Sequence, residues 1–339
     1  MEQALVERAD VRYRAIDSGQ LNGVNPLIFV RNGLRVLRGV GQALAIVDEE
    51  QPNVCLATGG YVCAPTVVAC WLRGVPVVIY LPDVAPGWTI RGLSHFARRV
   101  AVSLPAAAEH FGGEAPAGKA VVTGYPVRPA LVAAAQDRRA ARQKLAQALD
   151  RPLDDDRPLV LVTGGSQGAR SINRAVWQTL PQILPHAHLL HAVGDRDWLA
   201  LGHELDRAVA ALPEGVAERY HPFAYLHEEM ALALAAADLC VARAGASTLG
   251  EFPVAGLPSI LAPLPFGGVK QMENARELAA VGGATIVPDS QLNEELAPAL
   301  LRLLADGGEL GEMSDALALL AKPDAAQRIV DVLRAVAKS

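Results

Sequence analysis

The stretch LVLVTGGSQGARSIN, Leu159–Asn173, decides the fold of the second half of this chain. Its apolar, β-branched start ends at Gly164, and the sequence resumes as a helical pattern after a turn of small and polar residues. A strand, a Gly-rich turn and a helix make an anion site, because the first N–H groups of the helix lack partners and its dipole favours negative charge. The alternative is a tight turn without a ligand. The turn is neither a dinucleotide fingerprint nor a Walker loop, since no Lys-Ser/Thr follows.

The bulk composition is that of a globular enzyme-sized protein. With 339 residues, 51% of them hydrophobic, the chain is long enough for two domains. A net charge of -5 argues against nucleic acid as a partner. No apolar run reaches the ~20 residues of a membrane-spanning helix, and the charged start MEQALVERAD lacks the core of a signal peptide. The cysteines lack metal-type spacing and are interpreted as buried hydrophobes in a reducing cytoplasm: Cys55, Cys63, Cys70 and Cys240.

Short apolar runs alternate with amphipathic helical patterns along most of the chain. This alternation predicts βαβ units, that is, parallel sheets covered by helices on both faces. The predicted helices include Arg139–Leu149, Ala169–Leu184 and Asn274–Ala280. The predicted strand segments are residues 53–60, 75–82, 99–105 and 119–126 in the first part, and 159–165, 188–194, 238–245, 258–265 and 284–289 in the second.

Two domains are predicted from this pattern. The first covers residues 1–128 and the second residues 129–322, and we expect a C-terminal helix at 323–339 to pack back on the first domain. An α/β domain usually opens with a strand and a Gly-rich turn, yet the first convincing strand here is Val54–Thr58. We therefore expect the first sheet to lack its opening βα unit.

Gly-rich or small-residue turns recur after other predicted strands, at Gly59-Gly60 and within Val241–Glu251. Glu251 lies about one turn inside the predicted helix, where its carboxylate can accept two hydrogen bonds from ribose hydroxyls. The alternative is an acid that stabilises a helix N-terminus by only ~0.3–1 kcal/mol. The recurrence of such turns at the carboxyl ends of parallel strands, where ligands of α/β proteins bind, favours the nucleotide interpretation.

Four segments of the chain resemble the MurG family: TGGSQGARSIN, ADLCVARAGASTLGEFPVAGLPSILAPLP, KQMENA and TGYPVRP. These glycosyltransferases move N-acetylglucosamine from UDP-N-acetylglucosamine to lipid-linked N-acetylmuramyl-pentapeptide. The resemblance implies the GT-B architecture, in which two Rossmann-like domains face a cleft. It also implies an inverting transfer without a metal or other cofactor.

The resemblance implies a contact to the donor for each matched position. Ser166 should contact the diphosphate, and Arg128 in YPVR suits phosphate oxygens. Residues 246–251 should hold phosphate and ribose, with Glu251 on the ribose hydroxyls. The predicted substrate-binding residues are Arg128, Gly165, Ser166, Gln167, Gly168, Leu226, His227, Ala246, Ser247, Thr248, Leu249, Glu251, Gln271, Asp83, Gly59 and Gly60.

Other matches concern the two ends of the donor. Gln271 should contact the sugar, and Leu226 or His227 should lie against the uracil, with a register open by one residue. Taken alone, Arg128 also reads as a solvated loop arginine and Gln271 as a helix-surface glutamine.

The first domain departs from the family in two places. The family's opening Gly-rich loop, with a histidine that is a candidate base, lies upstream of Met1 and is missing from this sequence. The family's His-Glu-Gln-Asn is replaced by Tyr80–Asp83. A carboxylate ~4 Å from a diphosphate is repelled by about 4 kcal/mol at a surface-like dielectric, so Asp83 is expected to face the sugars. Asp83 is a candidate general base if burial raises its pKa, and the alternative is a turn residue before Pro86.

The segment Pro26–Leu44 combines an apolar stripe with basic flanks. Such a stripe can lie on an anionic bilayer surface, and the competing interpretation, which we favour for most of the apolar positions, is a helix packed on the first sheet. The apolar positions are Leu27, Val30, Leu34 and Leu37, and the basic ones are Arg31, Arg35 and Arg38. His186, His188 and His191 straddle a strand, and a core or surface role is expected for them rather than metal binding.

The sequence thus predicts a cytoplasmic glycosyltransferase peripheral to the inner face of the cell membrane. Its predicted partners are UDP-N-acetylglucosamine, a polyprenyl-diphosphate-linked muramyl-pentapeptide and the membrane surface, without nucleic acid. Two alternatives remain open. One is a related transferase with another lipid or small-molecule acceptor, and the other is a non-catalytic protein that binds nucleotide sugars.

Overall fold

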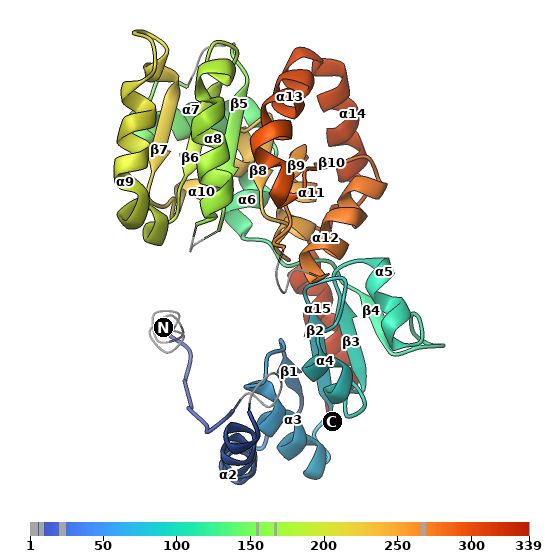
Figure 1. Ribbon diagram of the computed structural model, residues 1–339. Coiled ribbons are helices and arrows are strands. Elements are labelled where there is room, and N and C mark those ends of the chain that lie inside the picture. Colours follow the sequence, from blue (N-terminus) through green and yellow to red (C-terminus); the bar gives the residue numbers. More distant parts are fainter. Residues whose placement is uncertain are drawn as a thin grey trace.

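The computed structural model describes residues 6, 10–19, 25–153, 156–165, 168–265 and 269–338. They form two α/β units, each built on a sheet of parallel strands (Figure 1). The first unit has a four-stranded sheet in the order β1-β2-β3-β4, and the second has a six-stranded sheet in the order β10-β9-β8-β5-β6-β7. The predicted parallel α/β fold is confirmed.

The first unit occupies the part of the chain before residue 128. Its elements are α2 (Pro26–Glu50), β1 (Cys55–Ala57), α3 (Cys63–Leu72), β2 (Val77–Leu81), α4 (Trp88–Leu93), β3 (Arg99–Val102), α5 (Pro105–Ala108), η1 (Glu109–Phe111) and β4 (Ala120–Val122). Each of its strands falls within a predicted segment.

The second unit begins with two helices, α6 (Pro129–Ala134) and α7 (Arg138–Leu149), and continues as alternating strands and helices. These are β5 (Leu159–Thr163), α8 (Arg170–Ile183), β6 (His188–Ala192), α9 (Asp195–Ala210), η2 (Ala217–Arg219), β7 (Tyr220–Phe223), α10 (Glu229–Ala236), β8 (Leu239–Ala242), α11 (Thr248–Ala255), β9 (Ser259–Leu261), α12 (Val269–Ala280), β10 (Ala284–Ile286), η3 (Asp289–Gln291), α13 (Leu292–Ala305) and α14 (Gly307–Ala318). A last helix, α15 (Ala325–Val336), follows the second unit in the chain. Strand β7 has no counterpart among the predicted segments, because His221 and Pro222 interrupt its apolar pattern.

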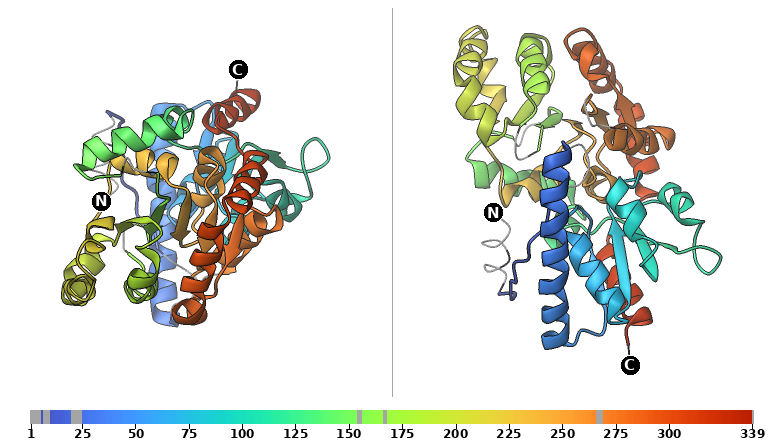
Figure 2. Two further views of the ribbon diagram at one scale, coloured as in Figure 1. Left: turned by 90° about the horizontal axis from the view of Figure 1, so that it is seen from above. Right: turned by 60° about the horizontal axis from the view of Figure 1, so that its bottom comes forward.

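Both faces of the six-stranded sheet are buried, which explains its unbroken apolar strands. Along β5, Leu159 and Leu161 pack in the core under α6, α7 and α10, whereas Val160 and Val162 pack in the core under α8, α9 and α13. The two helical layers on either side of the sheet are visible in Figures 1 and 2. Successive side chains of a strand point to opposite faces, so one strand supplies both cores.

The four-stranded sheet is covered on one face by a helix from the far end of the chain. Val78, Tyr80 and Ala101 point away from the main core of this unit and pack against Ile329 of α15. Figure 1 shows α15 along β2 and β3, although it follows the whole second unit in sequence. We propose the domains as residues 1–128 with α15, and residues 129–322.

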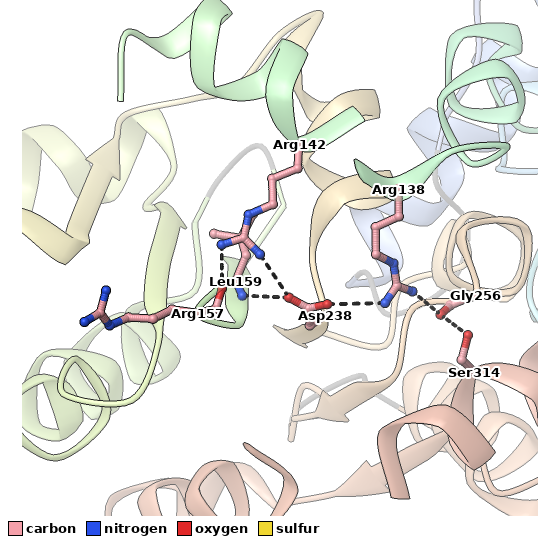
Figure 3. A network of polar contacts seen from close by, with 7 residues as sticks. All are labelled: Arg138, Arg142, Arg157, Leu159, Asp238, Gly256 and Ser314. Atoms are coloured by element: carbon pink, nitrogen blue, oxygen red, sulfur yellow. Dashed lines mark hydrogen bonds and ion pairs between the residues drawn. The ribbon is translucent and has the colours of Figure 1, made fainter. Parts of the chain in front are cut away.

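A polar network explains why α7 lies with the second sheet rather than with the first (Figure 3). Asp238, just before β8, accepts hydrogen bonds from the backbone N–H of Leu159 at 2.8 Å and from Arg138 of α7 at 3.3 Å. Arg142 of α7 reaches the same carboxylate at 3.5 Å. The carbonyl of Gly256 accepts from both Arg138 and Ser314. The network therefore joins α7, the amino ends of β5 and β8, and the ends of α11 and α14.

Helix α2 differs from the interpretation favoured for it. Val30, Leu34 and Leu37 are 62, 64 and 68% exposed, so packing on the first sheet is wrong for these three positions. The buried apolar residues of α2 lie further along, at Ala43 and Val47. The physical reason is that α2 contacts the rest of the unit mainly through α3, and Figure 2 shows it at the outer edge of the domain. The side chain of Leu27 is outside the described residues.

Candidate active site

A cavity opens at the carboxyl ends of β5, β6 and β8. It has a volume of about 830 Å³ and is lined by Thr163, Ala192 and Ala242 at these strand ends. Chain order reverses between β5 and β8, because the chain builds β6 and β7 on one side of β5 and then crosses to β8 on the other. Ligands of open α/β sheets bind at such a switch point, and the volume is that of a small-molecule site.

The glycine turn after β5 forms one wall of the cavity. Gly164, Gly165 and Gly168 line it together with the first residues of α8. Gly165 and Gly168 have φ of +78° and +80°, in the left-handed region that glycine tolerates. A Cβ at Gly164 would overlap the backbone nitrogen of Ala169, so the turn needs glycine there for packing as well. The predictions for Ser166 and Gln167 lie outside the described residues.

The turn after β8 forms the opposite wall. Gly245, Ser247 and Thr248 line the cavity where α11 begins. The Thr248 hydroxyl donates to the carbonyl of Gly245 at 2.7 Å, which fixes the turn. Because α8 and α11 both begin at the cavity, the positive ends of two helix dipoles meet there. The site is therefore suited to an anion such as a diphosphate.

Glu251 and Arg128 lie together at the cavity. Their side chains form an ion pair with Nη2 and Oε1 3.9 Å apart, and the Glu251 side chain is only 20% exposed. Burial raises the pKa of Glu251, while Arg128 and a hydrogen bond with Ser247 lower it. Arg128 also donates to the carbonyl of His227 at 3.3 Å. The structure thus brings two predicted donor contacts, 123 positions apart in the chain, to one site.

Gln271 lies at another side of the same cavity. Its side-chain oxygen accepts a hydrogen bond from the backbone N–H of Leu264 at 2.9 Å. This contact orients the amide so that its NH₂ group is available to a hydroxyl of a ligand.

Several predicted residues do not line the cavity. Leu226 is 2% exposed in the core of the second unit, and Tyr225 lines the cavity in its place, with its ring 4.7 Å from that of His227. Ala246 and Leu249 lie in the same segment after β8 as Gly245 and Thr248 but are absent from the cavity lining. Gly59, Gly60 and Asp83 lie in the first unit, after β1 and β2, and are also absent from the lining.

The lining includes basic residues that the sequence reasoning missed: Arg170, Arg174 and Arg243. Arg174 pairs with Glu204 at 2.7 Å, and Arg243 with Asp289 and Ser171. The ion pair of Arg170 with Asp197 is longer, at 3.7 Å, and the Arg170 side chain is half exposed. For Arg170, its position just after the Gly-rich turn was a signal in the sequence, since a guanidinium suits phosphate oxygens. Within the described ranges, no group of three or more His, Cys, Asp or Glu side chains is placed to hold a metal ion.

Comparison with known proteins shows which family this fold and cavity belong to. The family model described as "Glycosyltransferase family 28 C-terminal domain" matches residues 159–329. The model described as "Glycosyltransferase family 28 N-terminal domain" matches residues 1–102. The crystal structure of Acinetobacter baumannii MurG superposes with a TM-score of 0.73 at 26% identity, over 99% of this chain and 88% of that one. UDP-GlcNAc 2-epimerase from Neisseria meningitidis, bound to UDP-GlcNAc, shares the fold with a TM-score of 0.68 at 12% identity.

Fold and site together define a glycosyltransferase of the GT-B class, as the sequence predicted. A transferase of Roseiflexus is 39% identical to this chain over 98% of its length and 81% of the relative's, and that of Bacillus subtilis is 32% identical over 100% and 89%. Both are named UDP-N-acetylglucosamine–N-acetylmuramyl-(pentapeptide) pyrophosphoryl-undecaprenol N-acetylglucosamine transferase. The chain belongs to this family, the MurG family.

Proposed function

We propose that this protein transfers N-acetylglucosamine from UDP-N-acetylglucosamine to the C4 hydroxyl of a lipid-linked N-acetylmuramyl-pentapeptide. The acceptor oxygen forms a bond to the anomeric carbon while the bond to the UDP oxygen breaks, and a base takes the hydroxyl proton. The observation that carries the proposal is the cavity at the switch point, where two helix N-termini meet Arg128 and Glu251.

The chemistry of this site fits a departing diphosphate. Negative charge develops on the leaving UDP in the transition state, and preorganised dipoles and cations stabilise it without reorganisation. The N-termini of α8 and α11 and the guanidinium groups of Arg128 and Arg170 supply these charges. Glu251 accepts from the ribose hydroxyls, Tyr225 packs against the uracil, and Gln271 contacts the sugar.

Replacing Glu251 by alanine should weaken UDP binding by about 1–3 kcal/mol, the scale for hydrogen bonds to a charged group. This corresponds to roughly 5- to 150-fold in Kd. Calorimetric titration with UDP measures it. Glu273→Ala is the matched control, because Glu273 is a glutamate of α12 absent from the cavity lining and paired with Arg276. Equal UDP affinity of Glu251→Ala and the wild type would refute the ribose assignment.

A transferase with another acceptor is the second candidate. The replacement of the family's His-Glu-Gln-Asn by Tyr80–Asp83 favours it, because this change lies outside the donor cavity. UDP binding with the predicted Glu251 dependence, but without turnover of a muramyl-pentapeptide lipid analogue, would support this candidate over the first.

We also propose that the protein binds peripherally to the cytoplasmic face of the cell membrane through α2. No helix among the described residues is long and apolar enough to cross a bilayer. Val30, Leu34 and Leu37 are exposed beside the exposed Arg31 and Arg35, and Trp71 and Leu72 at the end of α3 are half exposed too. An exposed apolar stripe with basic flanks inserts at the boundary of an anionic bilayer.

Replacing Leu34 and Leu37 by glutamate should lower binding to anionic vesicles at least tenfold. Each leucine gains about 1.5–3 kcal/mol on full burial, and the new carboxylates are repelled by the lipids. Vesicle co-sedimentation measures the binding. Leu199→Glu is the control, because Leu199 is 86% exposed on α9 of the second unit. Unchanged binding of the α2 variant, or no binding of the wild type at low salt, would remove the proposal.

A further inference from the structure

The two units touch where the loop after β2 meets α12, and this contact is polar. One carboxylate oxygen of Asp83 accepts a hydrogen bond from the Asn274 amide at 3.0 Å, and the other lies 3.3 Å from the ammonium nitrogen of Lys270. The backbone N–H of Val84 donates to the Asn274 side-chain oxygen at 3.0 Å. Three hydrogen bonds thus run from one short loop of the first unit to one helix of the second.

Asn274 connects this contact to the donor cavity. It is fully buried, and its NH₂ group also donates to the carbonyl of Ala244 at 3.1 Å. Ala244 directly precedes Gly245, which lines the cavity. A buried amide whose oxygen and nitrogen are both engaged holds its partners in a fixed geometry, because each lost hydrogen bond leaves a buried polar group unpaired.

Lys270 adds charge to the contact. The side chains of Asp83 and Lys270 are 18% and 42% exposed, so the pair is partly shielded from water. The ammonium also lies close to Gly87, since a Cβ there would be 3.3 Å from the lysine nitrogen. The end of the lysine side chain therefore lies against the loop from Asp83 to Gly87.

We propose that Asp83, Lys270 and Asn274 form an interdomain latch that sets the position of the donor cavity relative to the first unit. In this role Asp83 is a positioning residue and not the base that accepts the proton. The inference rests on the proposed transfer reaction. Gln271, the proposed sugar contact, lies on the same helix as Lys270 and Asn274, so the latch holds the sugar end of the site against the first unit. A misplacement of about 1 Å between reacting groups costs ~100-fold in rate.

Asp83→Asn separates the two roles of this residue. Asparagine keeps an oxygen for Asn274 but loses the ion pair, so the latch predicts a loss of about three- to tenfold in turnover. A general base predicts at least a hundredfold loss. In the double variant Asp83→Asn with Lys270→Gln, the two amides can pair, and the latch predicts that turnover recovers at least threefold over the single variant. A base predicts no recovery.

The exchange rate of the Val84 amide hydrogen tests the latch without any substrate. Asp83→Ala should raise this rate at least tenfold, and the double variant Asp83→Asn with Lys270→Gln should raise it less. Thermal unfolding of each variant checks that the fold is kept. Unchanged Val84 exchange in Asp83→Ala, or a hundredfold loss of turnover in Asp83→Asn without recovery in the double variant, would overturn the proposal. Absence of UDP binding by the wild type would refute the proposed function instead, and leave the exchange result to decide on the latch.

Discussion

Replacing Gly168 by alanine should weaken UDP binding at least a hundredfold, or about 2.7 kcal/mol. Gly168 has φ of +80°, which costs an L-residue about 1–2 kcal/mol. The added Cβ would also lie 2.6 Å from the carbonyl oxygen of Val193 and 2.8 Å from a carboxylate oxygen of Asp197. The Val193 carbonyl follows β6 directly and cannot yield without moving the strand end. The glycine turn must therefore shift away from the position in which its N–H groups meet a diphosphate.

Gly165→Ala is a matched control for this steric argument. Gly165 lies in the same turn, lines the same cavity and has nearly the same φ, +78°, but a Cβ there meets nothing within 4 Å. The Gly165→Ala variant should have only the cost of an L-residue at positive φ, and it should lose far less affinity for UDP. Calorimetric titration with UDP compares the two variants, with thermal unfolding to confirm that both are folded. Equal losses in both variants would show that contact with Val193 and Asp197 does not position the turn.

The sequence predicted those parts of the fold that follow from local pattern. Parallel strands buried on both faces read as continuous apolar runs, and this is why β5 and β8 were found and β7, with His221 and Pro222, was not. Arg128, Glu251 and Gln271, which the family motifs single out, line the same cavity. Their roles toward the donor stay predictions.

The remaining features depend on contacts between residues distant in the chain. The helical periodicity of α2 predicts its apolar stripe, but it does not indicate whether another element covers this stripe. In the structure Val30, Leu34 and Leu37 are exposed. The partner of Asp83 lies 187 residues away on α12, and no local pattern indicates that pairing. Leu226 is buried in the core and its neighbour Tyr225 lines the cavity, a difference that the local sequence pattern does not indicate.

Buried histidines lie next to the donor site. The hydrogen bonds of one of them, His191, fit a neutral imidazole ring. The Asn173 amide donates to Val193 and Asp197, so its oxygen accepts from Nε2 of His191 at 3.0 Å. The other ring nitrogen, Nδ1, lies 2.9 Å from the Tyr220 hydroxyl, which itself accepts from Trp177. His191 is therefore held with its proton on Nε2. Burial lowers the pKa of His191 to about 3.

Lowering the pH from 6.5 to 4.5 should remove about 5 kcal/mol of stability through two such histidines. Burial, His188 and Arg151 lower the pKa of His221 to about 4. Because both folded-state pKa values lie below the unfolded value of 6.5, the unfolded state binds more protons in this interval. The contribution of these histidines to the free energy of unfolding is thus fully present above pH 6.5. Below this pH it falls by about 1.4 kcal/mol per pH unit for each histidine. The loss is of the order of the whole stability of many proteins. The raised pKa of Glu251 acts in the opposite direction, since its folded form takes up a proton first.

Urea unfolding at a series of pH values measures this loss. His191→Gln should flatten the dependence by about one proton, even if it lowers stability at pH 7, because the slope reports proton uptake and not the strength of the hydrogen bonds that the variant loses. His203→Gln is the control, because His203 is an exposed histidine of α9. An unchanged slope in His191→Gln would show that the pKa of this ring is not lowered in the folded protein.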